Sequence, residues 1–404
     1  MQLNHLPAAP HLMYCTNIHA AENWGEISAS LDEHLPLIKQ ELKSSSTLIE
    51  PFALGLRLSA IAANELSQPE HLEELKSQLS RLNAYVPSIN AFPYGGFHTA
   101  PIKQLVYQPD WLTTKRQTYT LQCAQILAQL LPDGVSGSIS TVPGAFKSQP
   151  WHVENNLHIA HHLIEVAAGL VKLERGSGKL IALALEPEPC CMLETVAETI
   201  HFFQNFLFSP EAVSTFAKLI GVNRSDAEAL LRRHIGVCYD VCHAAVEFEN
   251  PVDALQSLQA AGIGIPKIQL SCALRIPQML AELHPAVMRF NDGVYLHQVV
   301  VSQQGKLQRF TDLPEALSAF EQGTADGEWR IHCHVPVFLS QLDLFESTQA
   351  ELLAVLQALR SNTFSAHLEI ETYTWDVLPA AFKTESKATA IAREIAFIMK
   401  EIAL

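Results

Sequence analysis

The sequence contains no apolar run near the roughly 18 residues that a membrane-spanning helix needs. It also has no cluster of basic residues, and 27 Lys and Arg against 42 Asp and Glu give a net charge of −15. This balance argues against nucleic acid as a partner, because nucleic acids attract positive charge. The first ten residues lack the basic start and long apolar segment of a signal peptide. We therefore expect a cytoplasmic protein with no direct membrane insertion.

None of the eight cysteines belongs to a CxxC pair, so the common redox and zinc-ribbon motifs are missing. Most of the cysteines lie within apolar runs, where a reduced thiol behaves as a small hydrophobic group. We expect buried, reduced cysteines. The alternative is a thiolate metal ligand, for which Cys242 and Cys333 are the best candidates because each lies beside other ligand types.

Short apolar or β-rich runs alternate with longer amphipathic stretches. Helical periodicity is clear at Trp24, Ile27, Leu31, Leu35 and Ile38, which share one helix face. Eight strands, each followed by a helix, predict a (β/α)8 TIM barrel, here as a single domain over residues 1–404. The expected strands cover residues 13–18, 53–59, 84–90, 137–142, 180–186, 235–240, 267–271 and 366–371.

The segment from Ser271 to Ala366 is too long for one crossover between strands seven and eight. Residues 295–302 and 306–310 flank a Gln-Gln-Gly turn and predict a β-hairpin, and residues 329–337 form another strand-like run. We interpret the segment as an insertion at the catalytic face. A ninth strand outside the barrel, or a different choice of seventh strand, is the alternative.

Carboxylate and imidazole groups follow four of the apolar runs. Barrel enzymes collect catalytic groups at the C-terminal ends of their strands, and both group types are ligands of divalent metals. Glu186 and Glu371 are also candidates for the catalytic acid and base. The candidate ligands are Glu186, Asp240, His243, His332, His334 and Glu371.

Each of these candidates has a structural alternative. Asp240 and His243 could form a hydrogen bond without an ion, and Glu186 could be a solvated loop carboxylate. His332 and His334 lie two residues apart, so on a strand they point to one face. Glu369 and Glu371 are also two residues apart and would point to one face of their strand. For Glu369 the alternative is an ion pair low in the barrel. Glu371 is the better ligand candidate.

Substrate-binding candidates lie in other parts of the chain. The Gly- and Pro-containing segment 89–98 carries Asn90, several aromatic residues and His98, which suits a polyhydroxylated or ring-bearing ligand. Arg57, in an apolar strand, and Lys147 would supply local positive charge. We also consider His297 and His332 as substrate-binding residues. By contrast, we expect surface or packing roles for His158, His161 and His162, which lie on one amphipathic helix.

The stretch Asp240-Val241-Cys242-His243 resembles the D-x-C-H signature of the xylose isomerase-like barrels, which include sugar epimerases and endonuclease IV. The resemblance implies one to three divalent ions, of Zn, Mn or Mg, at the places matched by Glu186, Asp240, His243 and Glu371. The place after strand seven, a His in that superfamily, is matched by Gln269 here. Because Gln is a poor zinc ligand, His332 or His334 would have to compensate.

More closely, the whole chain resembles the EboE family of metabolite traffic proteins. The resemblance implies a barrel encoded with other genes of a metabolite-export cluster, including prenyltransferase-like and dehydroquinate synthase-like partners. It supplies no substrate. The stretches that carry it are residues 14–19, 55–59, 90–95, 138–143 and 369–379.

Two functional hypotheses follow. The first is a metal-dependent isomerase, epimerase, lyase or hydrolase acting on a hydroxylated small molecule, with Glu186 and Glu371 moving the proton. The second is a non-catalytic metabolite carrier or scaffold of an export system, which the Gln269 replacement favours. A nuclease fits poorly with the net charge of −15.

Overall fold

The computed structural model describes residues 1–97, 102–147, 150–376, 378–380, 383 and 385–403. Eight parallel strands form a closed barrel in the order β1-β14-β7-β6-β5-β4-β3-β2, so each strand lies beside its neighbours in the chain and the last pairs with the first. The predicted (β/α)8 barrel is confirmed. The strands are β1 (His11–Cys15), β2 (Phe52–Arg57), β3 (Ala84–Asn90), β4 (Gly137–Thr141), β5 (Ile181–Leu185), β6 (Ile235–Asp240), β7 (Gly264–Leu270) and β14 (His367–Ile370).

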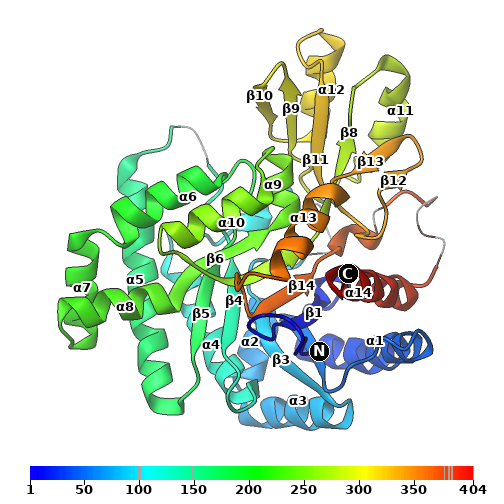
Figure 1. The fold of residues 1–404 in the computed structure, drawn as a ribbon. Coiled ribbons are helices and arrows are strands. Elements are labelled where there is room, and N and C mark those ends of the chain that lie inside the picture. The colour runs from blue at the N-terminus through cyan, green and yellow to red at the C-terminus, as the bar shows by residue number, and fades with distance from the viewer. Residues whose placement is uncertain (98–101, 148–149, 377, 381–382, 384, 404) are drawn as a thin grey trace.

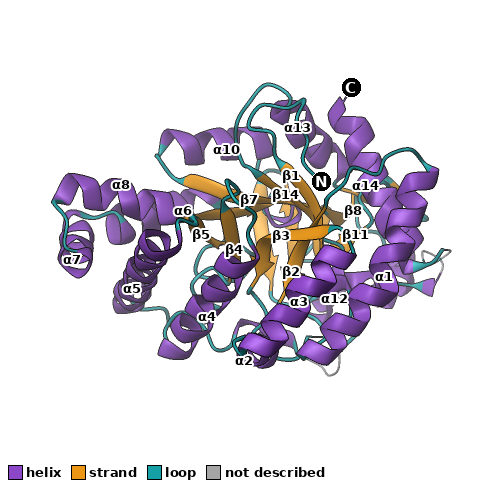
Figure 2. Ribbon diagram, turned by 90° about the horizontal axis from the view of Figure 1, so that it is seen from below, coloured by secondary structure: helices purple, strands orange, loops and turns teal. Residues whose placement is uncertain are grey.

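Helices surround the barrel, as the view in Figure 2 shows. The predicted stripe from Trp24 to Ile38 is the buried face of α1, and α14 at the end of the chain packs against the same helix. None of the described helices combines the length and apolar character of a bilayer span. The helices are α1 (Trp24–Ser44), α2 (Ala60–Leu66), α3 (Pro69–Arg81), α4 (Thr114–Leu130), α5 (Val153–Ser177), α6 (Val196–Phe202), α7 (Pro210–Ile220), α8 (Arg224–His234), α9 (Val241–Val246), α10 (Pro251–Ala260), α13 (Gln349–Leu359) and α14 (Lys387–Ala403).

A second sheet, at the top of Figure 1, interrupts the chain between β7 and α13. Its strand order is β10-β9-β11-β8-β13-β12. The predicted hairpin is β9–β10, in which Gln303 lies opposite Lys306, and the predicted run 329–337 is β11. The inserted elements are β8 (Cys272–Ile276), η4 (Ala281–Leu283), α11 (His284–Val287), η5 (Met288–Phe290), β9 (Val299–Gln303), β10 (Lys306–Phe310), α12 (Leu313–Glu321), β11 (Glu328–Val335), β12 (Gln341–Leu342) and β13 (Phe345–Ser347).

The insertion contains more strands than the hairpin and the single further run that the sequence analysis predicted. Only Ser271 separates the barrel strand β7 from the inserted strand β8, so no turn signal marks the boundary between the two sheets. β7 pairs with both β6 and β14, which removes the alternative of a different seventh strand. The interpretation of residues 1–404 as one domain stays a prediction.

A buried ion pair lies inside the barrel, between β7 and β14. The Nζ atom of Lys267 lies 2.5 Å from Oε1 of Glu369 and donates a hydrogen bond to Oγ of Ser140 at 3.0 Å. A Cβ atom on Gly55 would lie 1.5 Å from Oε2 of Glu369, so the carboxylate fits only because residue 55 lacks a side chain. Glu369 therefore forms an ion pair with Lys267, which was the alternative to a metal role given for Glu369 in the sequence analysis.

Candidate metal centre

Three carboxylates meet at the mouth of the barrel. Glu186 follows β5, Asp240 ends β6 and Glu371 follows β14, and each side chain is at most 4% exposed. One oxygen from each lies within 4.8 Å of the others. Oε2 of Glu186 and Oδ2 of Asp240 are buried without a hydrogen-bond partner. Buried carboxylates this close repel one another unless a cation or a proton intervenes.

Neighbouring side chains fix the orientation of two of these carboxylates. Oδ1 of Asp240 accepts from Oγ of Ser271 at 2.6 Å and from the backbone N–H of His243 at 3.1 Å, which caps the start of α9. Oε1 of Glu371 accepts from Nδ2 of Asn17 at 2.7 Å and from Nδ2 of Asn90 at 3.1 Å. The other oxygen atom of each carboxylate therefore remains able to bind an ion in the mouth of the barrel.

The pKa values of the three carboxyl groups move in different directions. Burial raises the pKa of Glu186 to about 8 and raises that of Glu371 well above its usual value, and nearby carboxylates add to both shifts. Burial also acts on Asp240, but His243, His334 and the Ser271 hydroxyl outweigh it and lower the pKa. The mouth therefore holds more carboxylate groups than its own cations neutralise.

Three imidazoles lie beside the carboxylates, and the Nδ1 atom of each faces an acceptor. Nδ1 of His243 lies 2.9 Å from the carbonyl oxygen of Pro187, and Nδ1 of His334 lies 2.8 Å from that of Glu371. Nδ1 of His332 lies 2.8 Å from Oε1 of Gln298. A carbonyl oxygen only accepts, so each Nδ1 carries a hydrogen, and Nε2 presents a lone pair wherever the ring is neutral.

These Nε2 lone pairs converge. Nε2 of His332 lies 3.1 Å from Nε2 of His243 and 3.3 Å from Nε2 of His334. Burial, with His243 as a charged neighbour, lowers the pKa of His332 well below its usual value and that of His334 to about 4, so both rings are neutral at pH 7. The unprotonated Nε2 atoms of His332 and His334 cannot donate to each other, whereas neighbouring carboxylates raise the pKa of His243, which would have to lose its Nε2 proton to bind an ion. Ligands about 2.0–2.1 Å from a tetrahedral zinc ion lie about 3.3 Å apart, which is the spacing found here.

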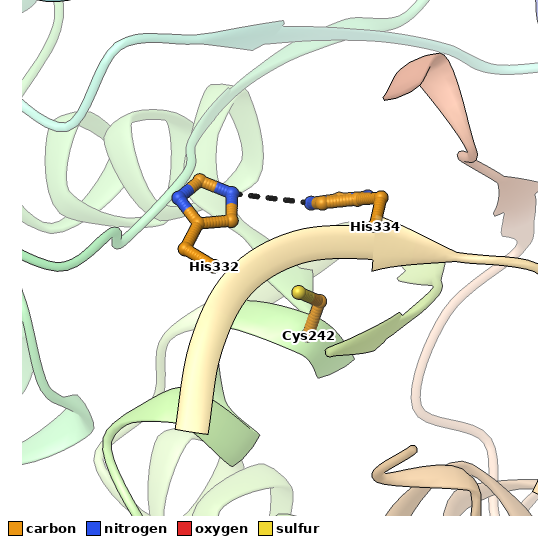
Figure 3. A group of neighbouring side chains, drawn as sticks. All are labelled: Cys242, His332 and His334. Carbon is orange, nitrogen blue, oxygen red and sulfur yellow. Dashed lines mark hydrogen bonds between the residues drawn. The ribbon is translucent and has the colours of Figure 1, made fainter. Parts of the chain in front are cut away.

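Further groups extend the array. Sγ of Cys242 belongs to a set with His332 and His334, and Glu188 belongs to a set with His243 and His332; within each set the ligand atoms lie within 4.8 Å of one another. Figure 3 shows the Cys242 side chain beneath the two imidazoles on β11. Burial raises the pKa of the Cys242 thiol well above its usual value. The thiol therefore lies within reach of a soft metal ion but stays protonated unless one binds.

Gln269 on β7 lies in the same cluster. Its Nε2 atom donates to Oε1 of Glu186 at 3.5 Å, while its Oε1 atom is buried without a hydrogen-bond partner. An amide oxygen ligates hard ions such as Mg²⁺ or Mn²⁺ better than it ligates Zn²⁺. The residues thus fit an oxygen-rich ion position next to an imidazole-rich one, and Asp240 lies within reach of both.

The structure brings most of the predicted ligands to one place. Asn90 and His332, predicted as substrate-binding residues, also line the cavity at the mouth. His98 lies outside the described residues. The predicted ligands that meet here are Glu186, Asp240, His243, Gln269, His334 and Glu371.

Three predicted substrate-binding residues do not line this cavity, and each has a structural partner instead. The guanidinium of Arg57 donates to the carbonyl oxygens of Ala21 and Gly95 and pairs with Glu22. The ammonium of Lys147 lies 3.1 Å from Glu198 and 3.4 Å from Glu194. Nε2 of His297 lies 2.7 Å from Asp292, and its Nδ1 atom lies 3.0 Å from the carbonyl oxygen of His332.

Several residues of the cavity were not among the chosen site residues. Glu188 follows Glu186 by two residues in an extended, proline-flanked segment, and this spacing could have identified it. Its Oε1 atom accepts from the Tyr107 hydroxyl at 2.7 Å. Asn17 and Tyr373 carry no sequence signal of their own, because they reach the site through the short turns η1 (Thr16–Ile18) and η6 (Tyr373–Asp376).

The chain matches no protein-family model and no curated protein. Solved structures of similar shape include a probable 3-DHS dehydratase, AsbF, from Bacillus anthracis, with 11% identity, a TM-score of 0.47, and 96% of this chain and 98% of that chain covered. The IOLI protein with a bound zinc atom has 14% identity, a TM-score of 0.47, and 97% of each chain covered. A xylose isomerase-like TIM barrel protein from Mycobacterium smegmatis in complex with magnesium has 9% identity and a TM-score of 0.48, covering 100% of this chain and 98% of that chain. These likenesses concern the fold alone.

Proposed function

We propose that this protein is a metal-dependent isomerase or epimerase that acts on a hydroxylated small molecule. The observation that carries the proposal is the convergence of three imidazole Nε2 atoms, each with its Nδ1 atom bound to an acceptor, beside three buried carboxylates. Among the described residues, Lys267 acts on two of these carboxylates but is already paired with Glu369, so apart from the histidines the positive charge that the cluster needs is missing. A divalent cation supplies it without disturbing the hydrogen bonds that orient the ligands.

The residues divide into two ligand sets. Glu186, Asp240 and Glu371 offer carboxylate oxygens, which suit Mg²⁺ or Mn²⁺. His243, His332 and His334 offer imidazole nitrogens, which suit Zn²⁺ or another transition metal. A bound ion would polarise a substrate carbonyl and stabilise the negative charge of an enediolate. We expect the protein to hold one ion in each set.

The protein's own groups would move the proton. Glu186 and Glu371 enter the mouth from β5 and β14, with one oxygen of each within 4.8 Å of the other. One carboxylate would take the proton from the carbon beside the substrate carbonyl. The other, in its protonated form, would return a proton to the neighbouring carbon or to the opposite face of the same carbon. Asn17 and Asn90 hold Glu371 in position for this exchange.

A second candidate is a metabolite carrier or scaffold that keeps the cavity but performs no reaction. Gln269, at the place of a ligating His, favours this candidate, and so does the resemblance to the EboE family described above. That resemblance also supports the proposal of protein partners from a metabolite-export cluster. The cytoplasmic location expected from the sequence stays a proposal. Both candidates predict metal binding, so metal content alone does not separate them.

Two measurements on the full-length protein test the proposal. The first is the metal content of protein purified without chelator, for which we expect close to two equivalents. The second is deuterium uptake from D₂O at carbons beside a carbonyl, followed by NMR over a panel of aldoses, ketoses and aromatic hydroxyketones. Exchange that disappears in Glu371→Gln supports the enzyme. Ligand binding without exchange supports the carrier, and a protein without bound metal contradicts both.

A further inference from the structure

The cavity above the candidate metal centre has two chemically different parts. Its floor is polar and consists of Asn17, Asn90, Glu186, Glu188, His243, His332 and Glu371. The wall comes from the loop after β3, from η2 (Lys103–Tyr107), from the segment before β9 and from η6. Among the described residues, this wall is mostly hydrocarbon. Its purely apolar side chains are Phe92, Pro93, Phe97, Ile102, Val106 and Leu296.

Three aromatic rings form one side of this wall. The centroid of the Phe97 ring lies 5.1 Å from that of Tyr295 and 5.2 Å from that of Tyr373, and the two tyrosine rings lie 5.3 Å apart. The rings come from three separate segments of the chain, one of them in the insertion. Such mutually supported rings form a stable apolar surface, which we call the aromatic wall.

The wall offers few hydrogen bonds to a polar ligand. The Tyr107 hydroxyl donates to Glu188 and accepts from Nε2 of Gln298 at 2.8 Å. The Tyr373 hydroxyl lies 3.5 Å from Nε2 of His332, at the floor. A sugar whose outer hydroxyls faced the apolar side chains would lose hydrogen bonds to water without replacement.

The charged residues near the wall also argue against a strongly polar substrate. Lys103 is the one Lys or Arg among the described residues that line the cavity, and its Nζ atom lies 2.5 Å from Oδ2 of Asp312. Arg57 and Lys147 lie in other ion pairs. Among the described residues of the wall, a phosphate or carboxylate at the far end of the substrate would therefore meet no Lys or Arg that lacks a carboxylate partner of its own.

From this division we infer that the substrate is amphipathic, with two neighbouring oxygens at one end and an apolar, ring-bearing body at the other. The oxygens would lie at the floor, and the body would lie against the aromatic wall. The inference rests on the proposed metal function of the floor and specifies its substrate class. It replaces a free sugar or a sugar phosphate with a hydroxyketone or hydroxyaldehyde that carries a hydrophobic group, because the proposed proton transfer needs a carbon beside a carbonyl; a catechol would bind there as a chelating analogue that does not react.

Binding of three probes to the zinc-loaded protein tests the inference. Catechol and 4-tert-butylcatechol share the chelating oxygens and differ in the apolar body, whereas sorbitol has oxygens along its whole length. Isothermal titration under anaerobic conditions gives each Kd. Because the extra carbons would be buried, we expect 4-tert-butylcatechol to bind at least about tenfold more tightly than catechol. We expect sorbitol to bind more weakly than either catechol.

Phe97→Ala should remove most of the apolar contact that buries the tert-butyl group. We therefore expect the ratio of the two catechol Kd values to fall below about threefold in this variant. Leu296→Ala is a second wall variant in case Phe97→Ala does not fold, and Phe206→Ala on η3 (Phe203–Leu207), outside the cavity, is the matched control. Metal content is measured on every sample. Equal affinities for the two catechols in metal-loaded protein, or tighter binding of sorbitol, would overturn the inference and leave the metal centre standing. Absence of bound metal would overturn the proposed function, and the inference with it.

Discussion

The Nε2 atoms of His243 and His332 lie 3.1 Å apart, although 89 positions separate the two residues in the sequence. His243 belongs to α9, directly after the barrel strand β6, and His332 belongs to β11 of the inserted sheet. The barrel alone contributes the carboxylates and one imidazole, while the insertion contributes two imidazoles. The candidate centre is therefore shared between the two sheets, and variants on either side test this arrangement.

On the insertion side, we expect His332→Ala to lose one of two metal equivalents, because its ligand atom lies within 4.8 Å of those of Cys242 and His334 and of those of Glu188 and His243, and its loss leaves the imidazole position with two nitrogens. Inductively coupled plasma mass spectrometry of dialysed protein measures the change. His201→Ala is the matched control, since His201 contacts Asn205 on the surface of the barrel. Unchanged metal content in His332→Ala would mean that the insertion supplies no ligand.

On the barrel side, Asp240→Asn tests the oxygen position. Alanine would also remove the acceptor that caps α9, whereas asparagine keeps an oxygen for Ser271 and the His243 N–H. We expect wild type to gain thermal stability when Mn²⁺ or Zn²⁺ is added, because an ion that binds only the folded state opposes unfolding. Asp240→Asn should gain less than half of that shift. Equal shifts in the two proteins would show that Asp240 is not a ligand.

The Lys267–Glu369 pair makes a prediction about stability alone. Lys267→Met leaves the Glu369 carboxylate buried without its partner, which should lower the free energy of unfolding by about 3–5 kcal/mol. The double variant Lys267→Met with Glu369→Gln should recover part of this loss, since neither side chain of the former pair is then charged. Urea denaturation of the four proteins measures the coupling. Additive losses in the double variant would mean that the two side chains do not stabilise each other.

Glu394 on α14 predicts a pH dependence of stability. Its Oε1 atom accepts from the Thr372 hydroxyl at 2.6 Å and from the backbone N–H of Val337 at 3.1 Å, yet burial raises its pKa to about 7. The folded state then holds this proton more tightly than the unfolded state, so stability falls as the pH rises from about 4.5 to 7.

Glu394→Gln removes this titration and keeps the acceptor oxygen. Relative to wild type, the variant should gain roughly 1–3 kcal/mol in free energy of unfolding between pH 4.5 and pH 8. Urea melts at a series of pH values measure the difference. A difference that stays constant over this range would show that Glu394 is ionised in the folded protein throughout.

The barrel was predictable from the sequence because each strand is a short apolar run and each run has a recognisable end. The groups at those ends were predictable for the same reason: Glu186, Asp240 and Glu371 are carboxylates at the point where an apolar run stops. Their placement together required only that parallel strands end at one rim. The buried Arg57 and His297 and the half-buried Lys147 were harder to assign, because the sequence around such a residue does not show which partner satisfies it.

The inserted sheet was predicted only in part. The β9–β10 hairpin has a turn motif, but β8 continues the apolar run of β7 past Ser271 with no break in composition. The aromatic wall was not predictable as a unit, since Phe97, Tyr295 and Tyr373 are far apart in the chain. Long-range contacts of this kind depend on tertiary packing, which single-sequence periodicity does not contain.

The direct passage from β7 to β8 has a consequence for the order in which the molecule assembles. The carboxylate position needs β5, β6 and β14, and the imidazole position needs α9 and β11, so neither is complete until segments far apart in the chain have met. Contacts of such high sequence separation have a large loop-closure entropy and are slow to form. Metal uptake during refolding would therefore report the last stage of assembly, when the barrel has closed and the second sheet has docked on it.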